Sequence, residues 1–368
     1  MNTPDRLALI YVNSIKSIRI YIIKLFKACL FVHNKHYNKI LVNRDGEFGD
    51  SIVVLPALSI IRQNFPNSQL DLLTINNNGV TFKDLNLDSN LVNNLIIINK
   101  DARVATLNQL KKNRYDLFIQ LPQNLGLYKS IRNMFLVRFM LGINSAFGWD
   151  HGRIKSFMRL QKEYLEIPTE TDRFINNIKQ AGLTGKIDYP INGIQPGNKA
   201  ITNFLETPGP IVFIIGGKLQ PKKWPLDHWV SLANLIDDKH KILIVGGKDE
   251  IKDAEFIISK TKNTINACDE LSIPELFYVL KNIAVAISLD TGAMHLCDAA
   301  GTKIIALIST RELTNKWHPN NRESIVIEKV LLCSFCLKTV CANNICMKYI
   351  SADEVYTEYL SLIERETN

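Results

Sequence analysis

Residues 39–75, KILVNRDGEFGDSIVVLPALSIIRQNFPNSQLDLLTI, hold the pattern that decides the fold. The first five form a short buried-strand pattern, and a glycine-containing loop follows over residues 44–50. Apolar residues then recur at helical spacing from Ser51 to Phe65, and Pro66-Asn-Ser68 stops that helix before residues 70–75 resume a strand. A strand, a crossover helix and a second strand of these lengths predict a parallel βαβ unit.

The same alternation continues along the chain, which predicts the α/β class with parallel sheets covered by helices. Further strands are predicted at residues 95–98, 115–121, 210–215, 241–245, 283–288 and 303–308, and helices at residues 226–236, 293–300 and 354–363. We therefore expect two Rossmann-like, doubly wound domains at residues 38–190 and 210–350, joined by a linker at 191–209 and followed by a terminal helix at 351–368. The carboxyl ends of the two sheets would face each other across a cleft, the usual ligand site.

Composition indicates a globular protein, because 46% of the 368 residues are apolar and 22% are charged. The net charge of +8 is unevenly distributed. Residues 1–44 hold eight basic residues and one acid, so the other 324 residues carry only +1. No basic face is implied for the folded domains, which argues against a nucleic-acid partner.

Residues 1–37 predict a basic amphipathic helix at the N-terminus. Their longest uncharged run, Leu7–Ile15, is too short to cross a bilayer, and no small-residue cleavage site follows it. Basic residues alternate there with apolar residues at helical spacing, namely Ile15, Ile18, Ile22, Leu25, Phe26 and Cys29. Such a helix lies in the headgroup region of an anionic membrane, although it could instead pack on the protein's own body. We expect a cytoplasmic protein whose N-terminal segment contacts an anionic membrane surface.

Residues 288–295, SLDTGAMH, join a predicted strand to a helix. Asp290 and Thr291 can cap the helix, and Gly292 allows a close backbone approach. The free N–H groups of the first turn, together with the helix dipole, favour an anion such as a diphosphate. An ordinary N-cap with a turn glycine is the alternative. His295 lies one turn into the helix, where it would face the phosphates or the sugar, or lie in the core.

Two further loops follow strands of the second domain. Residues 216–225, GGKLQPKKWP, carry Lys218, Lys222 and Lys223, and a lysine there can neutralise the charge that builds on a departing nucleoside diphosphate. A solvated basic loop is the alternative. In the loop at residues 246–250, Asp249 or Glu250 could accept hydrogen bonds from ribose hydroxyls.

Asp50 follows the first strand and opens a helix, so it is either an N-cap or a carboxylate that faces the cleft. In the second case it would take the proton from an acceptor hydroxyl as that oxygen attacks an anomeric carbon. The second domain offers no Asp-x-Asp pair in a strand-end loop for a divalent metal. We therefore expect no catalytic cofactor, with the leaving group stabilised by the helix terminus and the lysines.

Three blocks, GDSIVVLP at 49–56, KKWP at 222–225 and DTGAMH at 290–295, together resemble the signature of the glycosyltransferase family 9 heptosyltransferases. The resemblance holds in order and spacing from about Ile40 to Ile363. It implies a GT-B architecture, with an acceptor-binding first domain, a nucleotide-sugar-binding second domain and a last helix that crosses back to the first. It also implies that Asp50 is the catalytic base, and that Lys222 and Asp290-Thr291-Gly292 hold the donor diphosphate close to His295.

The activity that this resemblance implies is inverting transfer of a heptose or a related sugar from a nucleotide-diphosphate donor, ADP-heptose above all, to the inner core of lipopolysaccharide, with a sugar on lipid A as the acceptor. The N-terminal extension is not part of the family's usual pattern. Two alternatives are a non-catalytic, membrane-associated nucleotide-sugar-binding protein and a Rossmann oxidoreductase or sugar-nucleotide epimerase. The absence of Gly-x-Gly-x-x-Gly after a strand argues against the dinucleotide version of the latter.

Four of the seven cysteines, Cys333, Cys336, Cys341 and Cys346, cluster near the C-terminus. Their spacing is one that a tetrahedral structural zinc could use. The alternatives are reduced buried thiols and a redox-labile pair. Disulfides are not expected in a chain without a secretory signal.

Overall fold

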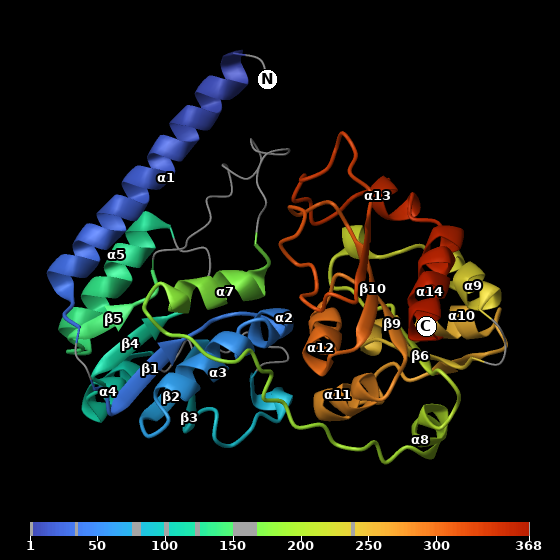
Figure 1. The fold of residues 1–368 in the computed structure, drawn as a ribbon, viewed down its shortest axis with the longest axis horizontal. Coiled ribbons are helices and arrows are strands. Elements are labelled where there is room, and N and C mark those ends of the chain that lie inside the picture. Colours follow the sequence, from blue (N-terminus) through green and yellow to red (C-terminus); the bar gives the residue numbers. More distant parts are fainter. Residues whose placement is uncertain are drawn as a thin grey trace. The chain divides into compact units, whose positions relative to one another are not determined.

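The computed structural model describes residues 3–33, 36–75, 82–98, 103–121, 126–149, 168–236 and 240–367 (Figure 1). Side chains are described from Ser17 to Glu364 within these ranges. The chain forms two compact units. Unit 1 comprises Met1–Lys83 with Leu87–Pro190, and unit 2 comprises Asp84–Asn86 with Ile191–Asn368. Each unit contains one sheet, and every strand pair that the structure describes is parallel, so the predicted α/β class is confirmed.

Unit 1 is built on a five-stranded sheet of order β3-β2-β1-β4-β5. The strands are β1 Lys39–Asn43, β2 Gln69–Ile75, β3 Asn94–Ile98, β4 Leu117–Gln120 and β5 Ser145–Phe147. The helical elements are α1 Thr3–Leu30, α2 Phe48–Ile52, α3 Leu55–Asn64, η1 Phe82–Leu85, α4 Arg103–Asn113, α5 Leu127–Phe135, the π-helical turn η3 Leu136–Met140, and α7 Glu170–Lys179. The predicted βαβ unit is present, because β1 pairs with β2 in parallel register.

The single helix predicted over residues 51–65 is instead two helices, α2 and α3. A proline interrupts it, because Pro56 lies in the first turn of α3 and has no backbone N–H to continue the helix that ends at Ile52. Helix α2 begins earlier than predicted, at Phe48, because the side chains of Glu47 and Asp50 form a capping box around its first turn. Asp50 is therefore the third residue of the helix and not its N-cap.

Unit 2 is built on a six-stranded sheet of order β11-β10-β9-β6-β7-β8. The strands are β6 Ile211–Ile214, β7 Ile242–Val245, β8 Thr264–Asn266, β9 Val285–Leu289, β10 Lys303–Ile308 and β11 Ile325–Glu328. The helical elements are α8 Lys199–Leu205, η4 Gln220–Lys222, α9 Leu226–Leu235, η5 Lys248–Glu250, α10 Ile251–Ile258, α11 Ile273–Lys281, α12 Gly292–Ala300, α13 Ile345–Lys348 and α14 Ala352–Thr367. Helix α8 lies within the segment that was predicted as a linker.

The core of unit 2 includes the last helix of the chain. Val355, Tyr359 and Leu362 of α14 are buried in one apolar cluster together with Trp229 of α9. The crossing of the last helix back to the first domain, which the family resemblance implied, stays a prediction; the observed packing attaches α14 to unit 2. The physical reason is the apolar face of α14, which buries its side chains against the α9 side of its own unit.

The C-terminal half of helix α1 packs on the rest of unit 1. Ile23 is buried there, and Phe31 is stacked on Trp149 with ring centroids 5.6 Å apart. Of the amphipathic pattern predicted at residues 15–29, the side chains of Ile15 and Lys16 lie outside the described part of the chain. Within the part of the chain that the structure describes, no helix is both long and apolar enough to span a bilayer.

Candidate active site

The strongest candidate site in unit 2 is the contact between Lys222 and Asp290. The Lys222 Nζ atom lies 2.7 Å from Asp290 Oδ2 and 3.3 Å from the Asp290 carbonyl oxygen. The Asp290 side chain is 4% exposed and that of Lys222 is 15% exposed, so the pair is well shielded from water. The two residues come from loops after β6 and β9, which are neighbours in the sheet, so the carboxyl ends of these strands bring together two residues that are far apart in sequence.

Helix α12 begins immediately beyond this pair. Thr291 is its N-cap residue in an extended conformation, and its side chain makes no capping hydrogen bond. Gly217, in the β6 loop, lies so close that a Cβ atom there would be 3.9 Å from Thr291 Cγ2. The first turn of a nine-residue helix, with its N–H groups and dipole, therefore lies against the loop that carries Lys222. An amine and a helix N-terminus at one place form an anion-binding arrangement.

His295 is 5% exposed, and its ring packs against the Trp317 ring with centroids 5.7 Å apart. Of the two roles considered for this residue, packing in the core is the one that this contact supports. A role beside the phosphates or the sugar stays a prediction.

The two candidates for ribose binding, Asp249 and Glu250, lie in different environments. Glu250 is buried, and its Oε1 and Oε2 atoms accept hydrogen bonds from Lys223 Nζ at 3.0 Å and Gly247 N at 3.1 Å. Burial alone would lower the pKa of Lys223, but the hydrogen bond and charge of Glu250, with Asp253, outweigh it and raise that pKa. Asp249 is exposed and makes no ion pair or hydrogen bond with the described residues.

The Lys222 loop is braced by residues that the sequence reasoning did not single out. The Asn344 side chain donates to the Lys223 carbonyl oxygen at 2.8 Å, and Trp224 Nε1 donates to the Ile350 carbonyl oxygen at 2.9 Å. The Gln220 side chain accepts from Cys341 N at 3.0 Å. These contacts join positions more than 100 residues apart, and no local pattern signals them.

The cysteine-rich segment therefore contacts the candidate site, but the structure does not gather its thiols. Cys333 is exposed, while Cys336, Cys341 and Cys346 are partly exposed, and all four are free. Among the described residues, no group of three potential ligands stands close enough to hold a metal ion. The structural zinc site stays a prediction.

In unit 1, Asp50 lies just beyond the carboxyl end of β1. Its Oδ1 atom accepts a hydrogen bond from Arg44 Nη2 at 2.9 Å, and its Oδ2 atom accepts one from Glu47 N at 3.2 Å. The Asp50 side chain remains 28% exposed, whereas that of Arg44 is 1% exposed. A Cβ atom on Gly46 would lie 2.3 Å from the Asp50 Cβ atom, so only glycine fits at that position of the loop.

The sequence reasoning missed Arg44, which is the closest charged partner of Asp50. Its guanidinium carbon stands 4.6 Å above the Phe174 ring of α7, at the same distance as that of Arg173. Burial lowers the pKa of Arg44, although the Asp50 charge opposes that shift. Arg173 is in turn paired with Glu170 at 2.6 Å. A basic residue directly after a buried strand was the available signal for Arg44.

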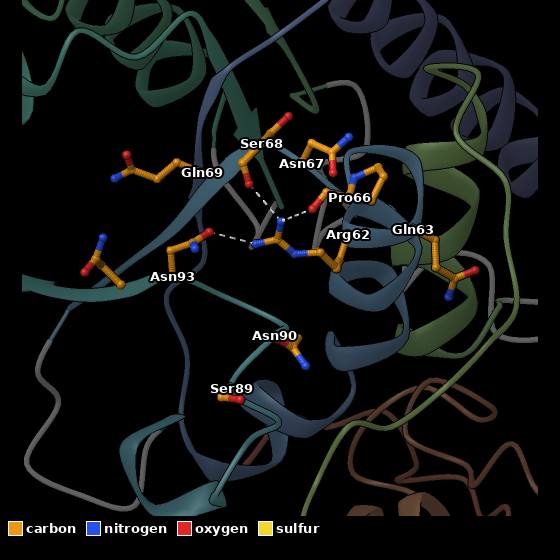
Figure 2. Close-up of a pocket in the computed structure, with 10 residues that line it drawn as sticks. Arg62, Gln63, Pro66, Asn67, Ser68, Gln69, Ser89, Asn90 and Asn93 are labelled. Carbon is orange, nitrogen blue, oxygen red and sulfur yellow. Dashed lines mark hydrogen bonds between the residues drawn. The ribbon is translucent and has the colours of Figure 1, made fainter.

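A cavity of about 930 Å³ in unit 1 lies away from this site (Figure 2). Arg62 lies on its wall and donates to the carbonyl oxygens of Ser68 and Leu91 and to Asn93 Oδ1. These partners precede or begin β2 and β3, so the cavity lies at the amino ends of the strands. Ligand sites in open parallel sheets lie at the opposite edge, where Asp50 is found.

The chain is similar to known proteins of one family. The sequence pattern of glycosyltransferase family 9 (heptosyltransferase) matches residues 103–346. The chain is 23% identical over 314 residues to a lipooligosaccharide heptosyltransferase 2 of Campylobacter jejuni, covering 82% of this chain and 92% of that protein.

Two solved structures are similar in fold. A glycosyl transferase family 9 protein of Veillonella parvula, 18% identical, superposes with a TM-score of 0.66 over 91% of this chain and 99% of that chain. The E. coli ADP-heptose lps heptosyltransferase II, 19% identical, superposes with a TM-score of 0.62 over 90% of this chain and 100% of that chain. The family match spans more than half of the sequence and includes the Lys222 and Asp290 blocks. The chain belongs to glycosyltransferase family 9, the heptosyltransferase family, and is a glycosyltransferase.

Proposed function

We propose that the protein transfers a heptose from ADP-heptose to the inner core of lipopolysaccharide, with inversion at the anomeric carbon and without a metal ion. The observation that carries this proposal is the Lys222–Asp290 pair at the first turn of α12. The names of the similar proteins support the sugar, the nucleotide and the acceptor: one is a lipooligosaccharide heptosyltransferase and another an ADP-heptose lps heptosyltransferase.

The donor diphosphate would lie on the N–H groups of Thr291 and Gly292, with the Lys222 ammonium beside it. Asp290 holds that ammonium in place at 2.7 Å. As the bond between the anomeric carbon and the phosphate oxygen breaks, the electron pair leaves with the nucleoside diphosphate. The lysine and the helix terminus stabilise the new negative charge in a site from which most water is excluded.

Asp50 would act on the acceptor side of the same step. As the acceptor oxygen forms its bond to the anomeric carbon, the O–H bond breaks and its proton passes to the Asp50 carboxylate. Attack opposite the departing phosphate inverts the configuration of that carbon. Because Asp50 lies in unit 1 and Lys222 in unit 2, the reaction requires the two units to face each other across the donor, which stays a prediction.

We also propose a cytoplasmic location at the inner face of the cytoplasmic membrane, where a lipid-anchored acceptor would be available. The basic N-terminal segment supports this location. We expect no nucleic-acid partner.

The donor site can be tested by thermal shift. A panel of ADP-, GDP- and UDP-sugars identifies the nucleotide, because a ligand of the native state raises the melting temperature by mass action. Lys222→Met should weaken binding of that nucleotide about tenfold or more, the scale of one lost charge-assisted contact. Binding of the corresponding nucleoside, which has no phosphates, should change little.

Lys252→Met is the matched control, because Lys252 is exposed on the neighbouring helix α10. The two variants lose the same charge, but only Lys222 contacts Asp290. Equal nucleotide affinity in the Lys222→Met variant and the native protein would remove this lysine from the donor site.

A further inference from the structure

Helix α5 and the π-helical turn η3 expose a row of large apolar side chains. Tyr128, Phe135 and Phe139 are 76%, 42% and 63% exposed and recur at i, i+7 and i+11, which places them on one face. Met140, 54% exposed, adjoins them. The opposite face is packed in the core of unit 1, so the exposed row is not needed for burial there.

Helix α1 carries a second row beside the first. Ile18, Tyr21 and Leu25 are 58%, 68% and 51% exposed and recur at i, i+3 and i+7. The two helices lie side by side (Figure 1), and Phe26 meets Phe135 edge to face with centroids 6.2 Å apart. We name the combined surface the apolar platform; its members are Ile18, Tyr21, Leu25, Tyr128, Phe135, Phe139 and Met140.

The segments that carry the apolar platform hold only positive charge. Residues 17–33 and 127–140 contain no acidic residue, and their basic residues are Arg19, Lys24, Lys27, Lys129, Arg132 and Arg138. Arg138 lies 5.8 Å from the centroid of the Phe139 ring. Arg132 recurs with the exposed row itself, four residues after Tyr128. Aromatic rings with interleaved cations are the pattern of a protein surface that sits in the headgroup region of a membrane.

A basic cavity of about 480 Å³ lies on the other flank of α1. Lys24 and Lys27 of α1 line it together with His33, Asn177 and Gln180. At about 100° per residue, Lys24 and Phe26 project to opposite sides of the exposed row of α1. The cavity and the α5 row therefore flank the same stripe, and Lys24 and Lys27 give the cavity ammonium groups of the kind that bind a phosphate group.

We propose that the apolar platform docks on an anionic membrane, with its aromatic side chains at the headgroup level and a lipid headgroup phosphate in the Lys24–Lys27 cavity. The inference rests on the proposed function, because it would place the acceptor-binding unit at the surface that holds a lipid-linked acceptor. It extends membrane contact from the N-terminal segment to α5 and η3. A second copy of the chain fits less well, because a two-fold interface would oppose six cations to six cations.

Vesicle flotation of the full chain tests the docking surface. The native protein should float with phosphatidylcholine vesicles that contain phosphatidylglycerol, and should remain unbound with phosphatidylcholine alone or at high salt. Phe139→Asp and Arg132→Glu should each reduce the bound fraction several-fold. Val104→Asp is the matched control for the first variant, because Val104 is 74% exposed on α4 of the same unit and should leave binding unchanged.

Melting temperatures within a few degrees of the native value would show that the variants are folded. Native-level flotation of folded Phe139→Asp and Arg132→Glu proteins would overturn the proposal. So would a dimer in sedimentation that Phe139→Asp dissociates, since the face would then belong to a second copy. Nucleotide-induced thermal shifts should be the same in all these proteins, so a missing donor response signals failure of the proposed function and not of the docking surface.

Discussion

At the scale of the residue, both carboxylate oxygens of Asp50 are held, one by Arg44 Nη2 and the other by Glu47 N. A carboxylate offers about four acceptor positions, so these two contacts fix its orientation and leave room for an incoming hydroxyl. The buried Arg44 supplies the fixed positive charge, and the exposed part of Asp50 is the part that a substrate can reach. A group that takes a proton in the transition state has to be both fixed and accessible in this way.

A residue-scale prediction concerns how the free energy of unfolding depends on pH. Burial, with smaller contributions from the nearby carboxylates of Glu250 and Asp253, raises the pKa of the Cys268 thiol to about 12 from an ordinary value of 9.0. Between pH 9 and 12 the folded protein keeps this proton while the unfolded chain loses it, so the free energy of unfolding falls as the pH rises. One such group contributes at most about 1.4 kcal/mol per pH unit.

Urea unfolding from pH 8 to pH 10.5 measures this dependence. The Cys268→Ala protein should start less stable at pH 8, because it leaves a small cavity, but lose less stability with rising pH than the native protein. Cys333→Ala is the control, because Cys333 is exposed. If the free energies of unfolding of Cys268→Ala and the native protein fall in parallel as the pH rises, this thiol does not contribute to the pH dependence.

At the scale of the element, the turn between β1 and α2 depends on one glycine. Gly46→Ala would force a methyl group against the Asp50 Cβ atom, which is the root of the side chain and not its flexible end. We expect a loss of about 1–3 kcal/mol in the free energy of unfolding, the usual cost of overpacking, and a fall in turnover as Asp50 shifts. Gly126→Ala, where no atom lies within 4 Å of the added Cβ, should change neither quantity by much. Chemical denaturation and initial rates of both variants check the prediction.

The elements that sequence reasoning found are those with a strong local pattern. The strand at 303–308 is observed as β10 Lys303–Ile308, and the helix at 293–300 as α12 Gly292–Ala300. The break at Pro56 was missed because the apolar spacing of α3 continues that of α2. The role of Arg44 and the brace from Asn344 were missed because each depends on contacts made by the folded chain.

At the scale of the whole molecule, the candidate chemistry is divided between two sheets. Asp50 belongs to unit 1, whereas Lys222, Asp290 and the first turn of α12 belong to unit 2. Each sequence block lies where a strand ends and a helix begins, which is why the sequence could predict that these residues lie at the carboxyl ends of strands. That Asp50 of unit 1 and Lys222 of unit 2 act on the same substrate is inferred from the proposed reaction.

Transfer of heptose from ADP-heptose to a heptose-free lipopolysaccharide acceptor, followed by mass spectrometry of the product with a chelator present, is therefore the most direct measurement. We expect the native protein to add one heptose and release ADP. Asp50→Asn should bind ADP-heptose within a few-fold of the native affinity. Its turnover should fall by a factor of about 10² or more, the scale of lost general-base catalysis. Native turnover by Asp50→Asn, or no heptose in the native product, would contradict the assignment.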